Sequence, residues 1–324
     1  MKTMSSIEVA RLGALNIDHL YQVEHILDDG EAVVNEAESF PGGSAANTIY
    51  GLAKLGVSTG FAGVVGDDAE GKLLLQDFQQ AGVDISQVRT KARARTGSVL
   101  CLSDRQGKRS LYVSPGANNL LTMDDLDLSY VNQAGMLHVS SFADDRQFQV
   151  SLEMIDRLDS SVKLSFAPGA IYAAKGLKSL NPILARAHVL FINQSEIQQL
   201  TGKDFKSGAE ICLEQGCHIV AVTLGKGASY KTAIATSYIR DAEAEYIVRP
   251  NIKNTGDEVD ATGAGDAFAA GFLYGLLNSK GAEQCGRLGD LVARFSITKP
   301  GARQGLPALK ELSQRYLELY SAEL

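Results

Sequence analysis

Short apolar runs rich in β-branched residues alternate along the chain with longer segments in which apolar residues recur at helical spacing. Ala45, Ile49 and Leu52 share one face of such a segment, which Gly56 ends. The pattern predicts strands at 7–15, 57–66, 136–142, 162–169, 188–193 and 218–225. It predicts helices at 44–56, 69–82, 146–158, 194–201, 207–216, 264–278, 284–298 and 307–320. This alternation is typical of an α/β fold with a mostly parallel central sheet between two layers of helices.

Two segments interrupt the alternation. Residues 17–40 are acidic and contain an extended piece, and residues 96–114 have the pattern of a hairpin with its turn near Asp104 to Gly107. We interpret both as strands of a small β-sheet lid, inserted in a single domain that spans residues 1–324. The alternative is that they are two ordinary surface excursions.

Composition and charge narrow the class of protein. Apolar residues make up 45% of the 324 residues, enough for a large core. No run approaches the roughly 20 apolar residues of a membrane span, and Glu8 and Arg11 make the N-terminus a poor signal peptide. The net charge of −7 argues against a general nucleic-acid binder. The four cysteines lack zinc or redox spacing, so we expect reduced thiols in a cytoplasmic protein.

A glycine-rich stretch precedes the expected helix at 264–278. Small residues at the start of a helix let backbone amides approach an anion, so Thr262, Gly263, Ala264 and Gly265 are candidates for binding a phosphate. Asp266 would repel a static phosphate. It is explained if it takes a proton from a hydroxyl that attacks the phosphate. The alternative is that Asp266 only complements the helix dipole.

A second glycine signal lies near the N-terminus. Gly42 and Gly43 precede the helix at 44–56, and Asn47 is in its first turn, where an amide can bind a polyol. We expect Asp18 at the carboxyl end of the first strand, where open α/β sheets bind ligands. A carboxylate there can accept hydrogen bonds from two adjacent sugar hydroxyls. Taken singly, each residue has a structural explanation as well.

Together these stretches resemble the ribokinase-like (PfkB) family of sugar and nucleoside kinases over almost the whole chain. GGSAANTIYGLAKLG (42–56) resembles the family's N-terminal signature, and DATGAGDAFAAGFL (260–273) closely resembles its C-terminal signature. Four further motifs fall in the family's order: GVVGDDAEGKLL (63–74), NQSE (193–196), TLGKGA (223–228) and KPGARQGLP (299–307).

The resemblance implies a ribokinase-like fold and ATP-dependent phosphorylation of a hydroxymethyl group, with Asp266 as the general base. It implies an anion hole made by the amides of residues 263–266. Asn193 and Glu196 match a motif that helps to place Mg²⁺ through water, and Thr223 and Gly225 match the loop that contacts the nucleotide. The resemblance assigns acceptor binding to Asp18, Gly42, Gly43 and Asn47. Some members bind K⁺ at positions that correspond to Asp260, Thr262 and Gly301. Lids of this family often pair, which implies a homodimer.

Departures from the family pattern leave the acceptor open. Many sugar kinases of the family have a lysine in the first signature, where this chain reads Gly-Gly-Ser-Ala-Ala-Asn. Ala167 stands where many members have an aspartate, and the C-terminal segment resembles archaeal nucleoside kinases. A free sugar and a nucleoside such as adenosine are both compatible acceptors. A sugar phosphate is a third option that needs basic residues near the acceptor, and a non-catalytic sugar- or nucleotide-binding sensor is the alternative from another class.

Other candidate motifs give weaker indications of function. Residues 66–73 approach a Walker A loop, but Leu73 stands where the magnesium-binding Ser or Thr belongs, so we expect a plain turn. The five histidines have no metal spacing. Basic residues of the hairpin region give it local positive charge, and one of them could contact a phosphate or the substrate: Arg93, Arg95, Arg105, Lys108 and Arg109.

Overall fold

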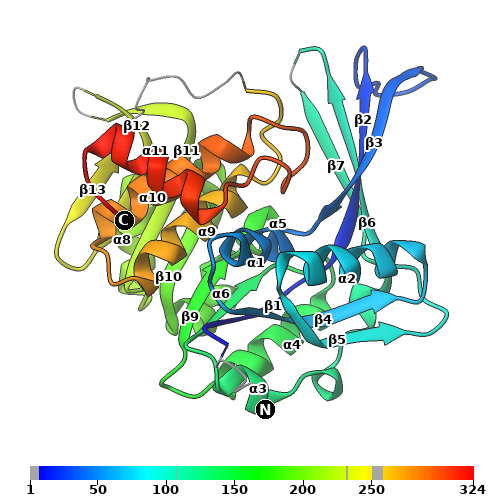
Figure 1. The fold of residues 1–324 in the computed structure, drawn as a ribbon, viewed down its shortest axis with the longest axis horizontal. Helices are drawn as coiled ribbons and strands as arrows, with labels where there is room; N and C mark the ends of the chain where they lie inside the picture. The colour runs from blue at the N-terminus through cyan, green and yellow to red at the C-terminus, as the bar shows by residue number, and fades with distance from the viewer. Residues whose placement is uncertain (1–6, 107, 231–232, 250–257) are drawn as a thin grey trace.

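A computed structural model describes residues 7–106, 108–230, 233–249 and 258–324, so Gly107 of the expected hairpin turn lies outside it. The chain forms two sheets (Figure 1). In order across the larger sheet, the strands are β13 (Glu245–Val248), β12 (Ala233–Asp241), β11 (Ile219–Tyr230), β10 (Ala187–Asn193), β9 (Lys163–Ala167), β8 (Met136–Ser140), β1 (Val9–Leu12), β4 (Thr59–Gly66) and β5 (Asp84–Lys91). All neighbouring strands from β11 to β5 pair in parallel, whereas β12 and β13 are antiparallel additions at one edge.

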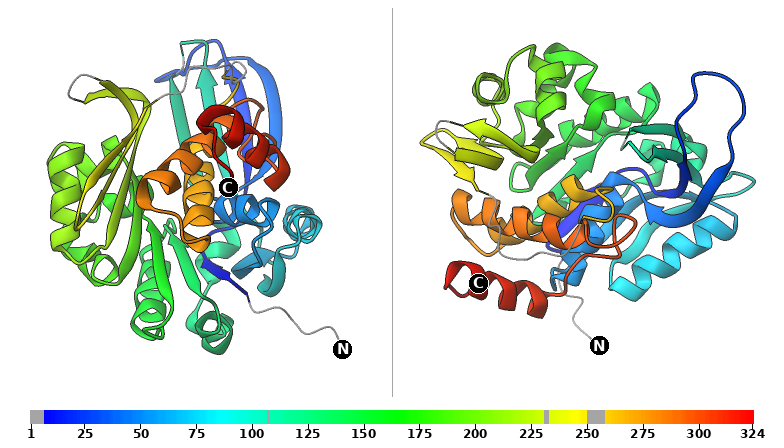
Figure 2. Two further views of the ribbon diagram at one scale, coloured as in Figure 1. Left: turned by 60° about the vertical axis from the view of Figure 1, so that its left-hand side comes forward. Right: turned by 90° about the horizontal axis from the view of Figure 1, so that it is seen from above.

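Helices cover both faces of this sheet, as the right-hand view of Figure 2 shows. One face packs against α3 (Leu128–Asn132), α4 (Asp145–Asp156), α5 (Gly169–Ala173), α6 (Gly176–Leu184), α7 (Gln194–Thr201) and α8 (Phe205–Glu214). The other packs against α1 (Ser44–Lys54), α2 (Ala69–Ala81), α9 (Ala264–Leu277) and α10 (Ala282–Ser296), with α11 (Leu309–Tyr320) outside α10. Two short 3₁₀ turns, η1 (Gly116–Leu120) and η2 (Met123–Asp125), follow the small sheet.

Side chains of the central strands alternate between the two cores. On β10, Leu190 and Ile192 join the core of α4 to α8, whereas Val189 and Phe191 join the core of α1, α2 and α9. A strand that is apolar on both faces can be covered by helices on both sides, as in parallel α/β folds. The expected three-layer α/β fold with a small β-sheet lid is confirmed.

The smaller sheet has the order β3 (Val34–Gly42), β2 (Asn16–Val23), β6 (Gly97–Asp104) and β7 (Arg109–Ser114), and it rises beside the core in Figure 1. β2 pairs with β3 and in parallel with β6, so the chain segments near residues 20, 40 and 100 lie side by side. The strand expected at 7–15 is shorter: β1 ends at Leu12, and the chain enters β2 at Asn16. In the described part of the chain, no helix combines the length and hydropathy needed to cross a bilayer.

Candidate active site

The N-terminus of α9 carries backbone amides without partners. Its N-cap is Gly263, whose φ of 74° lies in the left-handed region that favours glycine, and no side chain caps the helix. Within the described residues, the amides of Gly263, Gly265 and Asp266 donate no hydrogen bond, whereas that of Ala264 donates to the carbonyl of Ala261 at 3.2 Å. Unpaired amides at a helix N-terminus attract an anion.

The carboxylate of Asp266 turns away from these amides and towards α1. Ser44 Oγ donates to Oδ1 at 2.7 Å, and Asn47 Nδ2 donates to Oδ2 at 2.9 Å. Burial raises the pKa of Asp266 above its ordinary value, although these two hydrogen bonds and the charges of Arg11 and Arg303 act in the opposite direction. A fixed carboxylate with a raised pKa is suited to accept a proton near neutral pH.

Asp18 lies on the side of the site that the small sheet forms. It is in β2 rather than at the end of a strand of the central sheet, because the chain leaves that sheet at Leu12. A Cβ atom at Gly42, the end of β3, would lie 2.2 Å from Asp18 Oδ2, so only glycine permits this close approach. Gly43 follows as the N-cap of α1.

The carboxylate of Asp18 is 9% exposed and makes no hydrogen bond with the described residues. Burial raises the pKa of Asp18 to about 7, and the charge of Arg303 opposes this rise more than any other. A carboxylate with little exposure and no protein partner can accept hydrogen bonds from the hydroxyl groups of a ligand. Asp18 therefore offers an acceptor group in the space next to Asp266, whose charge also acts on its pKa.

Asp260, Thr262 and Gly301 meet beside the amides of α9. Oδ1 of Asp260 accepts hydrogen bonds from the amide and hydroxyl of Thr262, at 2.9 and 2.7 Å, and Oδ2 accepts from the amide of Gly301 at 2.9 Å. Arg109 of β7 donates through Nη2 to Thr262 Oγ1 at 2.6 Å. The small sheet thus contacts the loop that leads into α9.

A pocket of about 480 Å³ adjoins this loop. Its lining combines the loop, β11, β12 and the α10 region: Gly225, Lys226, Thr236, Glu258, Ala261, Ala264, Asp290, Ala293, Arg294 and Ile297. Of the two residues expected to contact a nucleotide, Gly225 lines the pocket, whereas Thr223 pairs with Asn193 in the sheet and does not line it. A ligand in this pocket would extend to Ala264 at the start of α9.

Known proteins share the sequence pattern and the fold of this chain. The family model described as pfkB family carbohydrate kinase matches residues 6–309. The chain belongs to this family. It is 38% identical to an uncharacterized sugar kinase of Archaeoglobus fulgidus over 79% of this chain and 98% of that protein. It is 29% identical to an ATP-dependent ribose-1-phosphate kinase of Halopiger xanaduensis over 92% of this chain and 94% of that protein. The crystal structure of ribokinase from Thermotoga maritima superposes with a TM-score of 0.80 at 25% identity, covering 96% of this chain and 99% of that one.

This pfkB-family protein is therefore a kinase, and its expected Mg²⁺ residues begin a helix. Asn193 and Glu196 form a capping box at the start of α7: Asn193 Oδ1 accepts from the amide of Glu196 at 2.9 Å, and Glu196 Oε2 accepts from the amide of Asn193 at 3.0 Å. Burial raises the pKa of Glu196, and the charge of Asp266 adds to this effect. Carboxylate and amide oxygens are ligand types that suit Mg²⁺ and its bound water, so the donor set of this pair fits Mg²⁺ held through water.

The residues that the resemblance assigns to K⁺ fit a directly bound ion less well than Asn193 and Glu196 fit a hydrated Mg²⁺. Both carboxylate oxygens of Asp260 already accept hydrogen bonds, and the hydroxyl of Thr262 contacts a guanidinium group. K⁺ binding stays a prediction. In the described ranges, no three His, Cys, Asp or Glu side chains gather as a metal site.

Two buried arginines and a serine of this site were not expected from the sequence. Arg11 of β1 is fully buried and donates to Ser140 Oγ at 3.0 Å and to the carbonyl of Ser44 at 3.4 Å. Arg303 is 4% exposed and contacts Asn47. The motifs contain Ser44 and Arg303, but nothing in their spacing indicates the contacts that they make.

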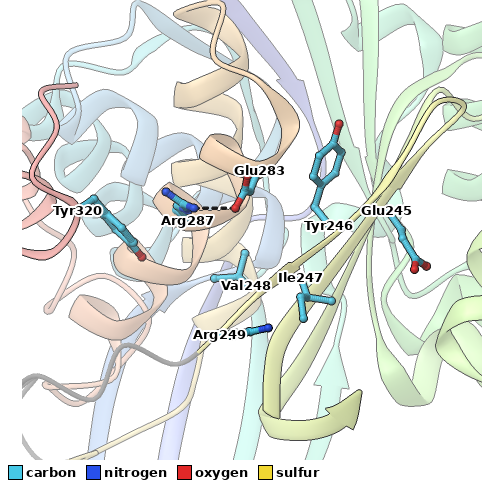
Figure 3. Close-up of a pocket in the computed structure, with 8 residues that line it drawn as sticks. All are labelled: Glu245, Tyr246, Ile247, Val248, Arg249, Glu283, Arg287 and Tyr320. Carbon is cyan, nitrogen blue, oxygen red and sulfur yellow. Dashed lines mark hydrogen bonds and ion pairs between the residues drawn. The ribbon is translucent and has the colours of Figure 1, made fainter. Parts of the chain in front are cut away.

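A second pocket, of about 560 Å³, lies away from these residues, between β13, α10 and the C-terminal helix (Figure 3). Two of its charged side chains pair with each other: Arg287 lies 2.6 Å from Glu283, and its guanidinium carbon lies 5.1 Å from the ring centre of Tyr320. The expected site residues lie outside this pocket, and the candidate active site is the region where α1, α9 and the small sheet meet.

Proposed function

We propose that this kinase transfers the γ-phosphoryl group of ATP to a hydroxymethyl group of a sugar or nucleoside, with Asp266 as the general base. One observation carries the proposal. Asp266 contributes an unpaired amide to the N-terminus of α9 and, at the same residue, a carboxylate that faces the elements bearing Asn47 and Asp18. A proton acceptor and an anion-binding backbone thus occur together, as phosphoryl transfer to an alcohol requires.

In the proposed mechanism, the acceptor hydroxyl lies between the carboxylate of Asp266 and the γ-phosphate. Asp266 removes the hydroxyl proton while the new O–P bond forms and the bond to the β-phosphate oxygen breaks, which yields ADP. The unpaired amides of Gly263, Gly265 and Asp266 bind the oxygens of the transferring group. Each oxygen of Asp266 retains a lone pair beyond its bond from Ser44 or Asn47, so the carboxylate can still accept the proton.

The nucleotide and the acceptor approach from different sides. The pocket that Gly225, Ala264 and Ile297 help to line supports a nucleotide site whose phosphates reach α9. Asn193 and Glu196 would hold Mg²⁺ through water, and the bound ion would supply positive charge to the phosphate oxygens. Asp18, Gly42, Gly43 and Asn47 would bind the acceptor, and the small sheet would act as the lid that excludes water.

A phosphorylated acceptor is a second candidate, which Arg109 favours. Its guanidinium contacts Thr262 and its charge acts on Asp18, so it lies at the border between acceptor and anion loop. A basic side chain there meets the requirement that a sugar-phosphate acceptor sets. The ribose-1-phosphate kinase relative is consistent with such a substrate.

The decisive experiment measures ADP release from ATP and Mg²⁺ with three acceptor panels: free sugars, nucleosides and sugar phosphates. We expect one acceptor to exceed the others in kcat/KM by at least about 10³-fold, because a missing hydrogen-bonding group leaves buried polar groups unpaired. Asp266→Asn tested on that acceptor is the control for contaminating kinases. Binding of ligand without transfer, with K⁺ present, would support a sensor instead.

We also propose that the chain forms one domain, that its lids pair in a homodimer, and that it is cytoplasmic. Exposed apolar side chains on the small sheet support the pairing: Val34, Leu100, Leu111, Tyr112 and Val113. Four free, buried cysteines support a reducing compartment. A monomeric mass in solution would contradict the pairing.

A further inference from the structure

Arg303 is a buried cation that three separate elements hold in place. Its side chain is 4% exposed, and its counter-ion is Asp77 of α2, to which Nη1 donates. The guanidinium carbon lies 5.2 Å from the ring centres of both Tyr50 and Phe78. Burying a charge is costly unless it is paired and hydrogen-bonded, so this arrangement calls for an explanation beyond filling the core.

The other donors of the guanidinium go to groups at the acceptor side of the site. Nε donates to Asn47 Oδ1 at 2.9 Å, and Nη2 donates to the carbonyl of Gly42 at 3.0 Å. Gly42 is the residue that packs against the carboxylate of Asp18. One rigid, planar group therefore connects α2, the end of β3 and the first turn of α1.

Asn47 has no freedom to reverse its amide between these neighbours. A guanidinium can only donate and an ionised carboxylate can only accept. With Arg303 donating to Oδ1, Nδ2 must point to Oδ2 of Asp266, where it donates at 2.9 Å. Arg303 thus determines which end of the amide Asp266 meets.

We propose that Arg303 is a positioning residue for phosphoryl transfer. It fixes the carboxylate of Asp266 through the amide of Asn47, and it fixes the acceptor-binding strand through the carbonyl of Gly42. This inference rests on the proposed function, because it needs Asp266 to act as the base. Its specific content is that Arg303 acts through Asn47.

The charges around Asp266 give a readout that a structural ion pair would not move. Arg11 on β1 and Arg303 lower the pKa of Asp266, and Ser44 and Asn47 lower it by hydrogen bonds. Glu196 on α7 and Asp18 on β2 are acidic groups that also interact with its charge. Loss of the Arg303 charge and of a fixed Asn47 donor raises the pKa of the base. The acidic limb of the kcat–pH profile then moves to higher pH.

The test is a double-mutant cycle on kcat with the acceptor found in the panel experiment. Arg303→Lys keeps the charge but loses the planar fork, and we expect it to lower kcat at least about tenfold with little change in KM for ATP. Arg303→Gln removes the charge and should also shift the acidic limb. Asn47→Ala should lower kcat by a similar factor. Adding Arg303→Lys to Asn47→Ala should change kcat less than about threefold, because the link is already broken.

Arg287→Lys is the matched control, since Arg287 is an ion-paired, ring-stacked arginine remote from the site. It should leave kcat unchanged. If the Arg303 variants fail to fold by thermal unfolding, Asn47→Asp replaces them. An aspartate at 47 still accepts from Arg303 but cannot donate to Asp266, so kcat should fall as in Asn47→Ala, and a wild-type kcat would overturn the inference.

The outcomes separate the two proposals. A wild-type enzyme that transfers phosphate to no acceptor overturns the proposed function and the role of Arg303 with it. An active wild-type enzyme whose Arg303 and Asn47 effects multiply, or whose Arg303 variants lose only thermal stability, overturns the inference alone.

Discussion

The turns that precede α2 and α9 both contain glycines and an aspartate. They differ in whether the aspartate accepts a hydrogen bond from an amide in the first turn of its helix. Before α2, Asp68 is the N-cap: its Oδ1 accepts from the amide of Gly71 at 2.8 Å and from the hydroxyl of Thr96 at 2.6 Å. Its Oδ2 accepts from the amide of Thr96 at 2.7 Å. This turn is the Walker-like stretch 66–73, and its aspartate holds the amide of Gly71 and links the turn to Thr96.

Before α9 the aspartate points the other way. Asp266 gives its carboxylate to Ser44 and Asn47 of α1, and no side chain caps α9. The amides of Gly263 and Gly265 stay open as a result. The direction of one carboxylate thus distinguishes the two helix starts: one has a side-chain cap and the other has none.

The largest effect should come from exchanging the two aspartates for asparagine. Asp266→Asn removes the proton acceptor and should lower kcat by about 10²–10⁴-fold, because general base catalysis contributes that much. Steady-state kinetics with the preferred acceptor measures it, and calorimetric titration checks that ATP still binds. Asp68→Asn should retain kcat; an equal fall in both variants would erase the distinction between the turns.

A second pair of variants adds side chains to the two turns. A Cβ atom at Gly265 meets nothing within 4 Å, whereas one at Gly71 would lie 2.3 Å from the carbonyl oxygen of Gly66. Gly265→Val should fold normally yet lower kcat at least about tenfold, since its side chain enters the space at the open amides. Gly71→Ala should instead lower the melting temperature. Wild-type kcat in Gly265→Val would show that phosphate does not approach there.

The pKa values of the two aspartates shift in opposite directions. Burial raises the pKa of Asp266. Partial burial also acts to raise the pKa of Asp68, but hydrogen bonds from Thr96 and Gly71 outweigh it and lower the value below 3.8. Since Asp266 must be ionised, kcat should fall as pH drops through its raised pKa, about tenfold per pH unit.

The stabilisation of the fold by ionised Asp68 should persist at the pH values where kcat falls. Because the pKa of Asp68 is lowered in the folded protein, its stabilising effect is complete above 3.8, the ordinary pKa, and is lost only as pH falls below that value. A kcat–pH profile and thermal unfolding on the same buffers measure both. A profile limb that moves in Asp68→Asn would contradict this assignment.

The smallest effect should be that of the cap itself. Asp68→Ala leaves the amide of Gly71 and the backbone of Thr96 without their partner, and we expect a loss of about 0.5–2 kcal/mol in the free energy of unfolding. Chemical denaturation measures it. Activity per folded molecule should equal that of the wild type, which a reduced kcat at low temperature would refute.

Much of the fold and part of the candidate site follow from local sequence. Periodicity places α9 within a residue of its observed end, and the motif of residues 260–273 identifies the loop with open amides. The prediction from local pattern fails where the chain passes from one sheet to the other. The strand expected at 7–15 ends at Leu12, and a new strand, β2, begins at Asn16, so Asp18 lies in the small sheet. The pattern also does not predict β12 and β13, the antiparallel strands at one side of the large sheet.

Contacts between distant segments could not be predicted. Arg303 bonds Asn47 across 256 residues, and Ser44 bonds Asp266 across 222. All four side chains are polar or charged, and nothing in their sequence neighbourhood names the distant residue that each contacts. These four residues come together in one site only because α1 packs against α9 and because the loop between α10 and α11, which carries Arg303, packs against α2.

The strands that bear Asp18 and Gly42 are themselves members of the small sheet, paired from Asn16 opposite Gly42. If Asp18 and Gly42 bind the acceptor as proposed, the groups that hold the acceptor belong to the same sheet as the proposed lid. Closing of that lid would then position the acceptor and exclude water in a single movement.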